Sequence, residues 1–313
     1  MKTRNVLKLM AILIAVVGIN IAGCKKDKTS TTPDPSSLQQ LSKDDAQVQA
    51  SDDEITGDAN AELSSTSAKA MDTTISSCNI TVDTVGGDSL QITLQYHGFN
   101  LGGNFKRTGT VVITKLLGVQ WKTAGCAVVF KYENLIVEKI SSGKTFTFNG
   151  TRTWTNVSGG LIKNLNGSTT VTHTITGAMT ITFDDGSTRI WNISRQRVWG
   201  GTFPSALTVT VSGFGSAAGY NNLVEYGTNR KGEAFYTQIN TPILYVYNSC
   251  LAFQWIPIWG VIEYQIPSVP KSATLTFGYN SSDALVPYGN CADYFRLDWV
   301  VKTNNGTDYF QIP

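Results

Sequence analysis

The sequence predicts an all-β fold: an antiparallel meander rolled into an open barrel or a two-layer sandwich. From residue 76 onward, Thr, Val, Ile, Phe, Tyr and Trp alternate with polar residues, the period-two pattern of half-buried strands. Gly and Asn-Gly interrupt these runs at short intervals, so successive strands should pair through hairpins. About fifteen runs follow one another, and a sheet of that size curls, closes or splits into two layers.

The strands can be placed one by one from this alternation, and residues 144–157 show it most clearly, with aromatic residues on one face and threonines on the other. No window of the region has a helical period. The predicted strands are residues 79–84, 89–96, 109–116, 126–138, 144–157, 168–176, 178–184, 188–199, 206–213, 233–239, 243–248, 260–266, 272–279, 293–302 and 307–312.

Turn residues set the predicted connections. Residues 184–187, Asp-Asp-Gly-Ser, and residues 304–306, Asn-Asn-Gly, are typical hairpin turns. Gly177 is interpreted as the break between two strands. Residues 200–222 are rich in Gly, Pro, Ser and Asn, and they mark a candidate seam between two sub-domains of the β domain over residues 76–313.

The first 24 residues predict export and lipidation. Basic residues precede an apolar stretch over residues 9–19, and the segment ends Ile-Ala-Gly-Cys. This ending resembles the bacterial lipobox, which implies a signal peptide over residues 1–23 and a diacylglycerol on Cys24. Several acyl chains, palmitate among them, would anchor the protein stably in a membrane. We expect the outer membrane and leave open which side the protein faces; the alternative is an uncleaved anchor with an incidental cysteine.

Residues 24–75 predict a flexible tether that follows the lipidated cysteine. The segment has no aromatic residue, and residues 25–75 carry ten acidic against five basic residues. Such a composition buries too little apolar surface to offset the chain entropy lost on folding. A short helix between Leu38 and Val48 has only a thin pattern. The acidic runs at residues 44–45 and 52–54 are interpreted as solvated, because they lack the spacing of a calcium loop.

Four further cysteines follow Cys24, and export favours disulfide bonds over metal ligands. Four cysteines allow three pairings. We prefer Cys78–Cys126 with Cys250–Cys291, because each pair then stays within its own half of the chain. Four free, buried thiols are the alternative.

Charge and motifs exclude several classes of function. Residues 76–313 carry 17 Lys and Arg against 13 Asp and Glu without a basic cluster, so a nucleic-acid partner is not indicated. The chain has two histidines and no catalytic or phosphate-binding motif. The sequence therefore gives no catalytic residue, no metal site and no cofactor, and it predicts a non-enzymatic protein.

Tryptophans and arginines at matching strand positions form the candidate ligand-binding site. Aromatic faces beside cations hold sugars or peptides by stacking and hydrogen bonding. The other interpretation, which we favour, is that the tryptophans form the core and the arginine stems pack beside them. The candidate residues are Trp154, Trp191, Trp199, Arg195 and Arg197, with Arg152 and Arg189 at the same parity.

Six short segments also carry a resemblance to a family. They are residues 109–113, Gly125-Cys126 and residues 149–156, 185–191, 195–199 and 288–293. In this order they resemble a group of uncharacterised all-β lipoproteins from Bacteroidota over most of residues 78–313. The resemblance implies a lipid-anchored β protein of the outer envelope and supplies no activity.

Three hypotheses for function follow. The first is an envelope lipoprotein with a structural or ligand-binding role, which contacts the membrane through its anchor and has a peptide, glycan or envelope protein as partner. The second is a surface glycan-binding or carbohydrate-active lipoprotein. The third is a carrier of apolar ligands, which requires a continuous apolar cavity.

Overall fold

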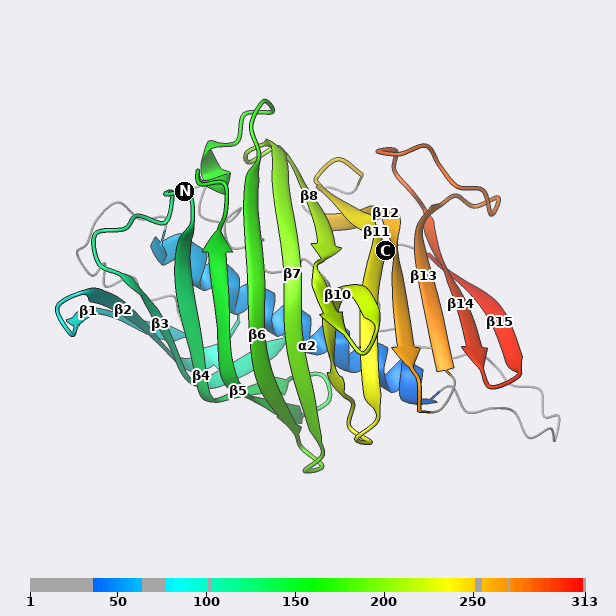
Figure 1. The fold of residues 1–313 in the computed structure, drawn as a ribbon, viewed down its shortest axis with the longest axis horizontal. Coiled ribbons are helices and arrows are strands. Elements are labelled where there is room, and N and C mark those ends of the chain that lie inside the picture. Colours follow the sequence, from blue (N-terminus) through cyan, green and yellow to red (C-terminus); the bar gives the residue numbers. More distant parts are fainter. Residues whose placement is uncertain (1–35, 64–76, 101–102, 251–254, 269–270, 312–313) are drawn as a thin grey trace.

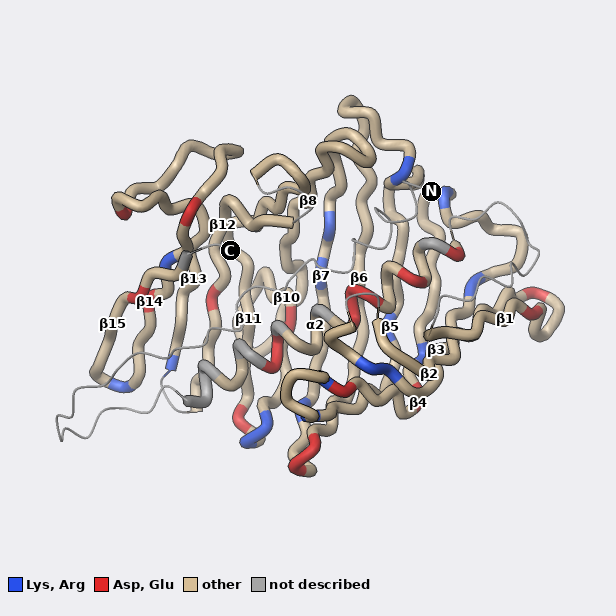
Figure 2. The backbone as a smooth tube through the Cα atoms, turned by 180° about the vertical axis from the view of Figure 1, so that it is seen from behind, with Lys and Arg blue, Asp and Glu red and all other residues tan. Residues whose placement is uncertain are grey.

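The computed structural model describes residues 36–63, 77–100, 103–250, 255–268 and 271–311. One antiparallel sheet curls around a long helix, α2 (Ser36–Leu63), which runs across the strands (Figure 1). The predicted all-β meander, rolled and open, is therefore confirmed. Seen from behind, α2 lies against the inner face of the sheet (Figure 2).

The strands follow one another along the chain with one short 3-10 helix, η2 (Ile162–Asn164), between the fifth and the sixth. They are β1 (Cys78–Val85), β2 (Ser89–Phe99), β3 (Phe105–Leu116), β4 (Cys126–Lys139), β5 (Lys144–Asn156), β6 (Val171–Phe183), β7 (Thr188–Thr202), β8 (Ala206–Gly213), β9 (Gly215–Ala217), β10 (Tyr220–Thr228), β11 (Ala234–Tyr247), β12 (Trp255–Ile266), β13 (Lys271–Tyr279), β14 (Tyr294–Val301) and β15 (Asn304–Gln311).

Neighbours in sequence pair from β1 to β7 and from β10 to β15. Between these two runs, β8 and β10 share the space between β7 and β11. The strand β8 pairs with one end of both, and β10 pairs with the other end, so the four strands form a closed ring of pairings. The candidate seam at residues 200–222 lies here, and the sheet continues through it.

Some predicted boundaries were wrong. The predicted strands at residues 168–176 and 178–184 are one strand, β6 (Val171–Phe183), that passes through Gly177, and β11 likewise joins two predicted strands. The strands β9 and β10 were not predicted. The last hairpin turns at residues 302–303, where Lys302 has a φ of 56°, and residues 304–306 belong to β15.

The position of Gly177 explains the false turn. Gly177 pairs with Arg152 across β5 and β6, and a Cβ atom at residue 177 would lie 2.5 Å from the Cβ of Arg152. Gly150, two residues before Arg152 on β5, has a φ of +132° and leaves room for the backbone of Ala178 in the same way. These glycines permit close approach and strand bending inside a strongly curved sheet, and they do not end a strand.

The predicted tether is wrong for residues 36–63, which form α2; the rest of residues 24–75 lies outside the described residues. Leu41, Val48 and Ile55, seven residues apart, pack into the core of the sheet. The predicted thin helix at residues 38–48 is the first part of α2. The composition argument failed because it counted only apolar burial, whereas the acidic side chains of α2 are buried against arginines.

Two clusters of buried apolar residues form the core. The first joins α2 to the inner face of β1–β7 and includes Phe130, Phe148 and Trp191. The second lies among β8 and β11–β14, and it includes Val209 and Ile258. Trp199 belongs to the second cluster, so β7 contributes to both.

The disulfide Cys250–Cys291 is confirmed, whereas the predicted pair Cys78–Cys126 is wrong, because both cysteines are free and buried. Cys78 begins β1 and Cys126 begins β4, so their strands alone are three strand spacings, or about 14 Å, apart. A disulfide needs Cα atoms within about 7 Å. Sequence proximity was therefore a poor guide, since strand order sets the distance. Burial raises the pKa of the Cys78 thiol to about 12.

The signal peptide and Cys24 lie outside the described residues. Among the helices that the structure does describe, none has both the length and the hydropathy needed to cross a bilayer.

Candidate functional site

The inner face of the sheet carries a set of buried arginines. Alternation along each strand turns them inward beside aromatic residues, as with Arg152 and Trp154 on β5 and Arg189 and Trp191 on β7. Their charges need partners, because an unpaired buried charge is costly. The buried arginines of the sheet are Arg107, Arg152, Arg189, Arg195 and Arg197, and Arg230 lies in the turn between β10 and β11.

The acidic residues of α2 supply most of the counter-charges. Apart from Asp53, which returns to β7, successive carboxylates along the helix meet arginines of successively earlier strands, so the contacts form a ladder across the sheet. The pairs are Asp44–Arg230, Asp45–Arg189, Asp52–Arg152, Asp53–Arg197 and Asp58–Arg107.

Helix rise and strand spacing make this ladder regular. Asp45 and Asp52 are seven residues apart, so a rise of 1.5 Å per residue separates them by about 10.5 Å. Their partners Arg189 and Arg152 lie on β7 and β5, two strands or about 9.6 Å apart. A helix perpendicular to the strands therefore matches every second strand with a heptad repeat.

The middle of the ladder is the most completely bonded. Arg152 donates from Nη1 to Asp52 Oδ2 at 2.5 Å and from Nη2 to Thr56 Oγ1 at 2.5 Å. The Tyr132 hydroxyl donates to the other carboxylate oxygen of Asp52 at 2.6 Å. The guanidinium also lies over the ring of Phe130, 4.5 Å from its centroid. One turn of α2 is thus bound to β4 and β5 by four side chains.

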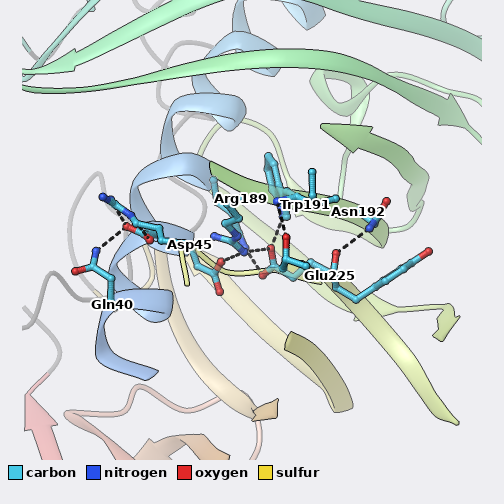
Figure 3. A network of polar contacts seen from close by, with 12 residues as sticks. Gln40, Asp45, Arg189, Trp191, Asn192 and Glu225 are labelled. Atoms are coloured by element: carbon cyan, nitrogen blue, oxygen red, sulfur yellow. Dashed lines mark hydrogen bonds and ion pairs between the residues drawn. The ribbon is translucent and has the colours of Figure 1, made fainter. Parts of the chain in front are cut away.

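A second network joins α2 to β7 and β10, shown close up in Figure 3. Arg189 forms ion pairs with Asp45 on the helix and with Glu225 on β10, the latter at 3.5 Å. Trp191 donates its indole N–H to Glu225, and Gln49 of α2 donates to the same carboxylate at 2.8 Å. Two carboxylates therefore share one arginine here.

The two ends of α2 are bound as well. Near the start of α2, Arg230 donates two hydrogen bonds, of 2.6 and 2.8 Å, to the carboxylate of Asp44. Near its end, Arg107 lies 3.3 Å from Asp58 and 3.8 Å from Glu54. Polar contacts thus fix the helix along its whole length.

Burial controls the protonation of these acids. Removal from water raises the pKa of Asp45 well above its ordinary value, against the charge of Arg189, and the charge of Glu225 raises it further. Burial also raises the pKa of Asp52 and of Glu54, although Arg152 and Arg107 oppose it. Keeping these carboxylates charged in the folded protein therefore costs free energy.

The candidate residues Trp154, Trp191, Trp199, Arg195 and Arg197 all point inward and are at most 3% exposed. The open face for stacking a glycan is absent from this arrangement, because α2 and the core cover it. Arg197 and Arg195 lie side by side on β7, and Trp199 follows them on the same face.

Sequence reasoning missed the acidic half of the site. Asp44, Asp45, Asp52 and Asp53 were interpreted as solvated, yet each is at most 3% exposed. Two signals were available: acidic pairs eight residues apart, and apolar residues at a seven-residue interval on the same segment. Arg107 and Arg230 had no signal of their own, since a single inward arginine in a strand or turn is unremarkable.

The side chains of this site offer charges and hydrogen-bonding groups for binding. In the described ranges, no group of three or more His, Cys, Asp or Glu side chains is placed to hold a metal ion. Comparison of the chain with protein-family models, with curated proteins and with solved structures gave no match.

Proposed function

We propose that this protein is a lipid-anchored, non-enzymatic binding protein of the outer envelope. Its arginine-lined inner face binds an acidic helical segment, and α2 occupies that face in the free protein. A partner with a similar acidic helix displaces α2 and takes over the arginines. The ladder of buried ion pairs between α2 and the sheet is the observation that carries this proposal.

The chemistry of the contact favours an exchangeable occupant. Buried ion pairs stabilise a fold less than apolar residues of similar volume do, and their best-attested use is to specify one partner or register. A helix that served only to fill the core would carry apolar residues at positions 45 and 52. Here those positions are Asp45 and Asp52, whose pKa values are raised by burial.

Competition with α2 sets the affinity that a partner needs for the arginine-lined face. Because α2 belongs to the same chain, its effective concentration at the face is in the millimolar range. A partner must therefore bind tightly or make contacts that α2 lacks. Acidic charge also speeds encounter with an arginine-lined face and makes the rate salt-dependent.

The test is a binding experiment with a labelled synthetic peptide of residues 36–63. A chain with Asp52→Asn and Asp53→Asn holds its own helix less firmly, so it should bind the peptide at least tenfold more tightly than wild type. Binding should weaken as salt rises, because the pairs are ionic.

Two controls make the experiment decisive. A peptide with Asn at the four positions 44, 45, 52 and 53 should not bind, and Arg152→Gln in the chain should abolish binding of the acidic peptide. Lys131→Gln alters only an exposed ion pair with Glu133, so it should change nothing. Equal binding of acidic and neutral peptides would rule out recognition by the arginines.

The anchor is tested separately. Cys24→Ser should move the protein from the membrane fraction to the soluble fraction, and the mass of the native protein should exceed that of the chain from residue 24 by the acyl groups. A native mass equal to the unmodified chain would refute lipidation.

A further inference from the structure

Arg195 on β7 differs from the other buried arginines. Each of the others has a carboxylate within ion-pair distance, whereas Arg195 has none among the residues that the structure describes. It is 2% exposed, and its Nε and Nη2 atoms are buried without a hydrogen-bond partner. These two atoms lie on one edge of the guanidinium, and such an edge binds two oxygens of a carboxylate or phosphate at once.

Three other side chains with unpartnered nitrogens lie at nearby inward positions of β6 and β7. Arg197 follows two residues later on the same face of β7, and its Nε has no partner. His173 on β6 is directly opposite Arg197, and both of its ring nitrogens are buried and unpartnered. Trp199, the next inward residue of β7, has an unpartnered indole Nε1. Consecutive inward residues along a strand are about 6.6 Å apart, so Arg197 lies between Arg195 and Trp199, which are about 13 Å apart, and the four residues form one continuous patch of the inner face.

The balance of charge in this patch is positive. Arg197 is neutralised by Asp53 of α2 at 2.5 Å. Asp53 also acts on Arg195, more strongly than Glu225 and Asp52 do, but all three act from beyond ion-pair distance, and they are already paired with Arg197, Arg189 and Arg152 respectively. Burial and the charge of Arg197 lower the pKa of His173 to about 3, so His173 is neutral and offers one N–H donor. One positive charge and several N–H donors remain without a counter-ion.

We propose that this patch is a binding site for a small oxyanion, a free carboxylate or phosphate group. The anion accepts two hydrogen bonds from the Nε–Nη2 edge of Arg195 and further ones from Arg197 Nε, His173 and Trp199 Nε1. It supplies the counter-charge that α2 does not supply. The anion binds while Asp53 of α2 stays on Arg197, so anion binding does not require peptide exchange.

The test uses the full chain and calorimetric titration with phosphate and with acetate, each at constant ionic strength set by chloride. Wild type should bind at least one of them with one-to-one stoichiometry and gain thermal stability. Comparing the two anions tells whether the site prefers a tetrahedral or a planar group. No binding beyond the chloride blank would overturn the proposal.

Variants locate the site. Arg195→Met should weaken anion binding at least tenfold while leaving the anion-free protein as stable as wild type or more so, because an unpaired buried charge is removed. Arg296→Met, at a half-exposed arginine of β14 bonded to Asp298, is the matched control and should bind normally. Unchanged affinity in Arg195→Met would refute the assignment.

A milder change covers the case in which Arg195→Met does not fold. Trp199→Phe removes only the indole N–H and keeps an aromatic ring, so affinity should fall a few-fold; unchanged affinity would count against the site. Arg152→Gln should lose the acidic peptide and keep the anion, which separates failure of this site from failure of peptide exchange.

Discussion

The two ends of the sheet are held together in different ways. Around β1–β7 the core contains α2, and its ion pairs with Arg107, Arg152 and Arg189 are buried among aromatic rings. Around β8 and β11–β14 the core is apolar. The disulfide Cys250–Cys291 crosslinks the segment after β11 to the segment between β13 and β14. The ion pair Arg296–Asp298 on β14 is half-exposed.

Because of this difference, one end of the sheet contributes mainly stability and the other end contributes mainly specificity. Apolar packing and a covalent bond stabilise one end regardless of salt and pH. The other end depends on a helix whose charges are buried, an arrangement that specifies one register but adds little net free energy. We infer that the β1–β7 end is the exchangeable part and the β8–β14 end is its support.

The largest effect is expected from Asp52→Asn, which leaves Arg152 buried without its counter-charge. Breaking a buried ion pair on one side costs about 3–5 kcal/mol. Urea unfolding should show this loss, and protease should cut α2 sooner than in wild type. Glu133→Gln, in an exposed pair, should show no change. A loss in Asp52→Asn below that of an ordinary surface substitution would mean that the ladder does not hold α2.

Removing the disulfide should affect the opposite end. The Cys250→Ala, Cys291→Ala double variant opens a loop with a sequence separation of 41, for which the chain-entropy model gives about 4 kcal/mol and strain or residual structure usually less. Hydrogen exchange should rise in β11–β14 and remain unchanged in α2. Equal loosening of α2 would show that the two ends unfold as one unit.

Acidification should stabilise the docked helix at first. Asp45 and Glu54 have folded pKa values above their ordinary values of 3.8 and 4.5, so the folded state takes up protons at these residues before the unfolded state does. Their contribution to the free energy of unfolding therefore rises as the pH falls through the folded pKa values, and it is complete below the unfolded ones. A gain of about 1 kcal/mol per pKa unit is expected in urea titrations. A steady loss from pH 7 downward would contradict it.

The smallest effect is expected from Asp45→Asn. Arg189 keeps Glu225 at 3.5 Å, and a buried carboxylate with a raised pKa is removed, so stability at pH 7 should stay within about 1 kcal/mol of wild type. The pH dependence should become shallower at the same time. A loss as large as that of Asp52→Asn would show that Asp45 is the essential partner of Arg189.

Local patterns predicted the strands well. Alternation located β1–β5, β7, β8, β13 and β14 to within a few residues, since the period of side-chain burial is a property of each strand alone. Gly177 was wrongly interpreted as a strand break, because a glycine that makes room for Arg152 on the neighbouring strand cannot be distinguished in sequence from a turn glycine. The strands β9 and β10 were missed since they are short or lack an alternating pattern.

Long-range pairing was not predictable in the same way. Asp52 and Arg152 are 100 residues apart in sequence, and the residues around each of them give no indication that the two form a pair. The same is true of Cys78 and Cys126, whose separation in space follows from strand order. For the candidate binding residues Trp154 and Arg197, alternation along the strands predicted that they share one face of the sheet. It did not predict that α2 and the core cover that face.

The sequence by itself determined that this chain forms a rolled antiparallel sheet and that its arginines and tryptophans share one face, because both follow from local periodicity. Only the tertiary structure decided that residues 36–63 form a helix inside the curl of the sheet. The physical reason is that a segment so rich in acidic residues is unfavourable to bury alone. It becomes a core element only where the folded sheet presents arginines at the spacing of its own turns.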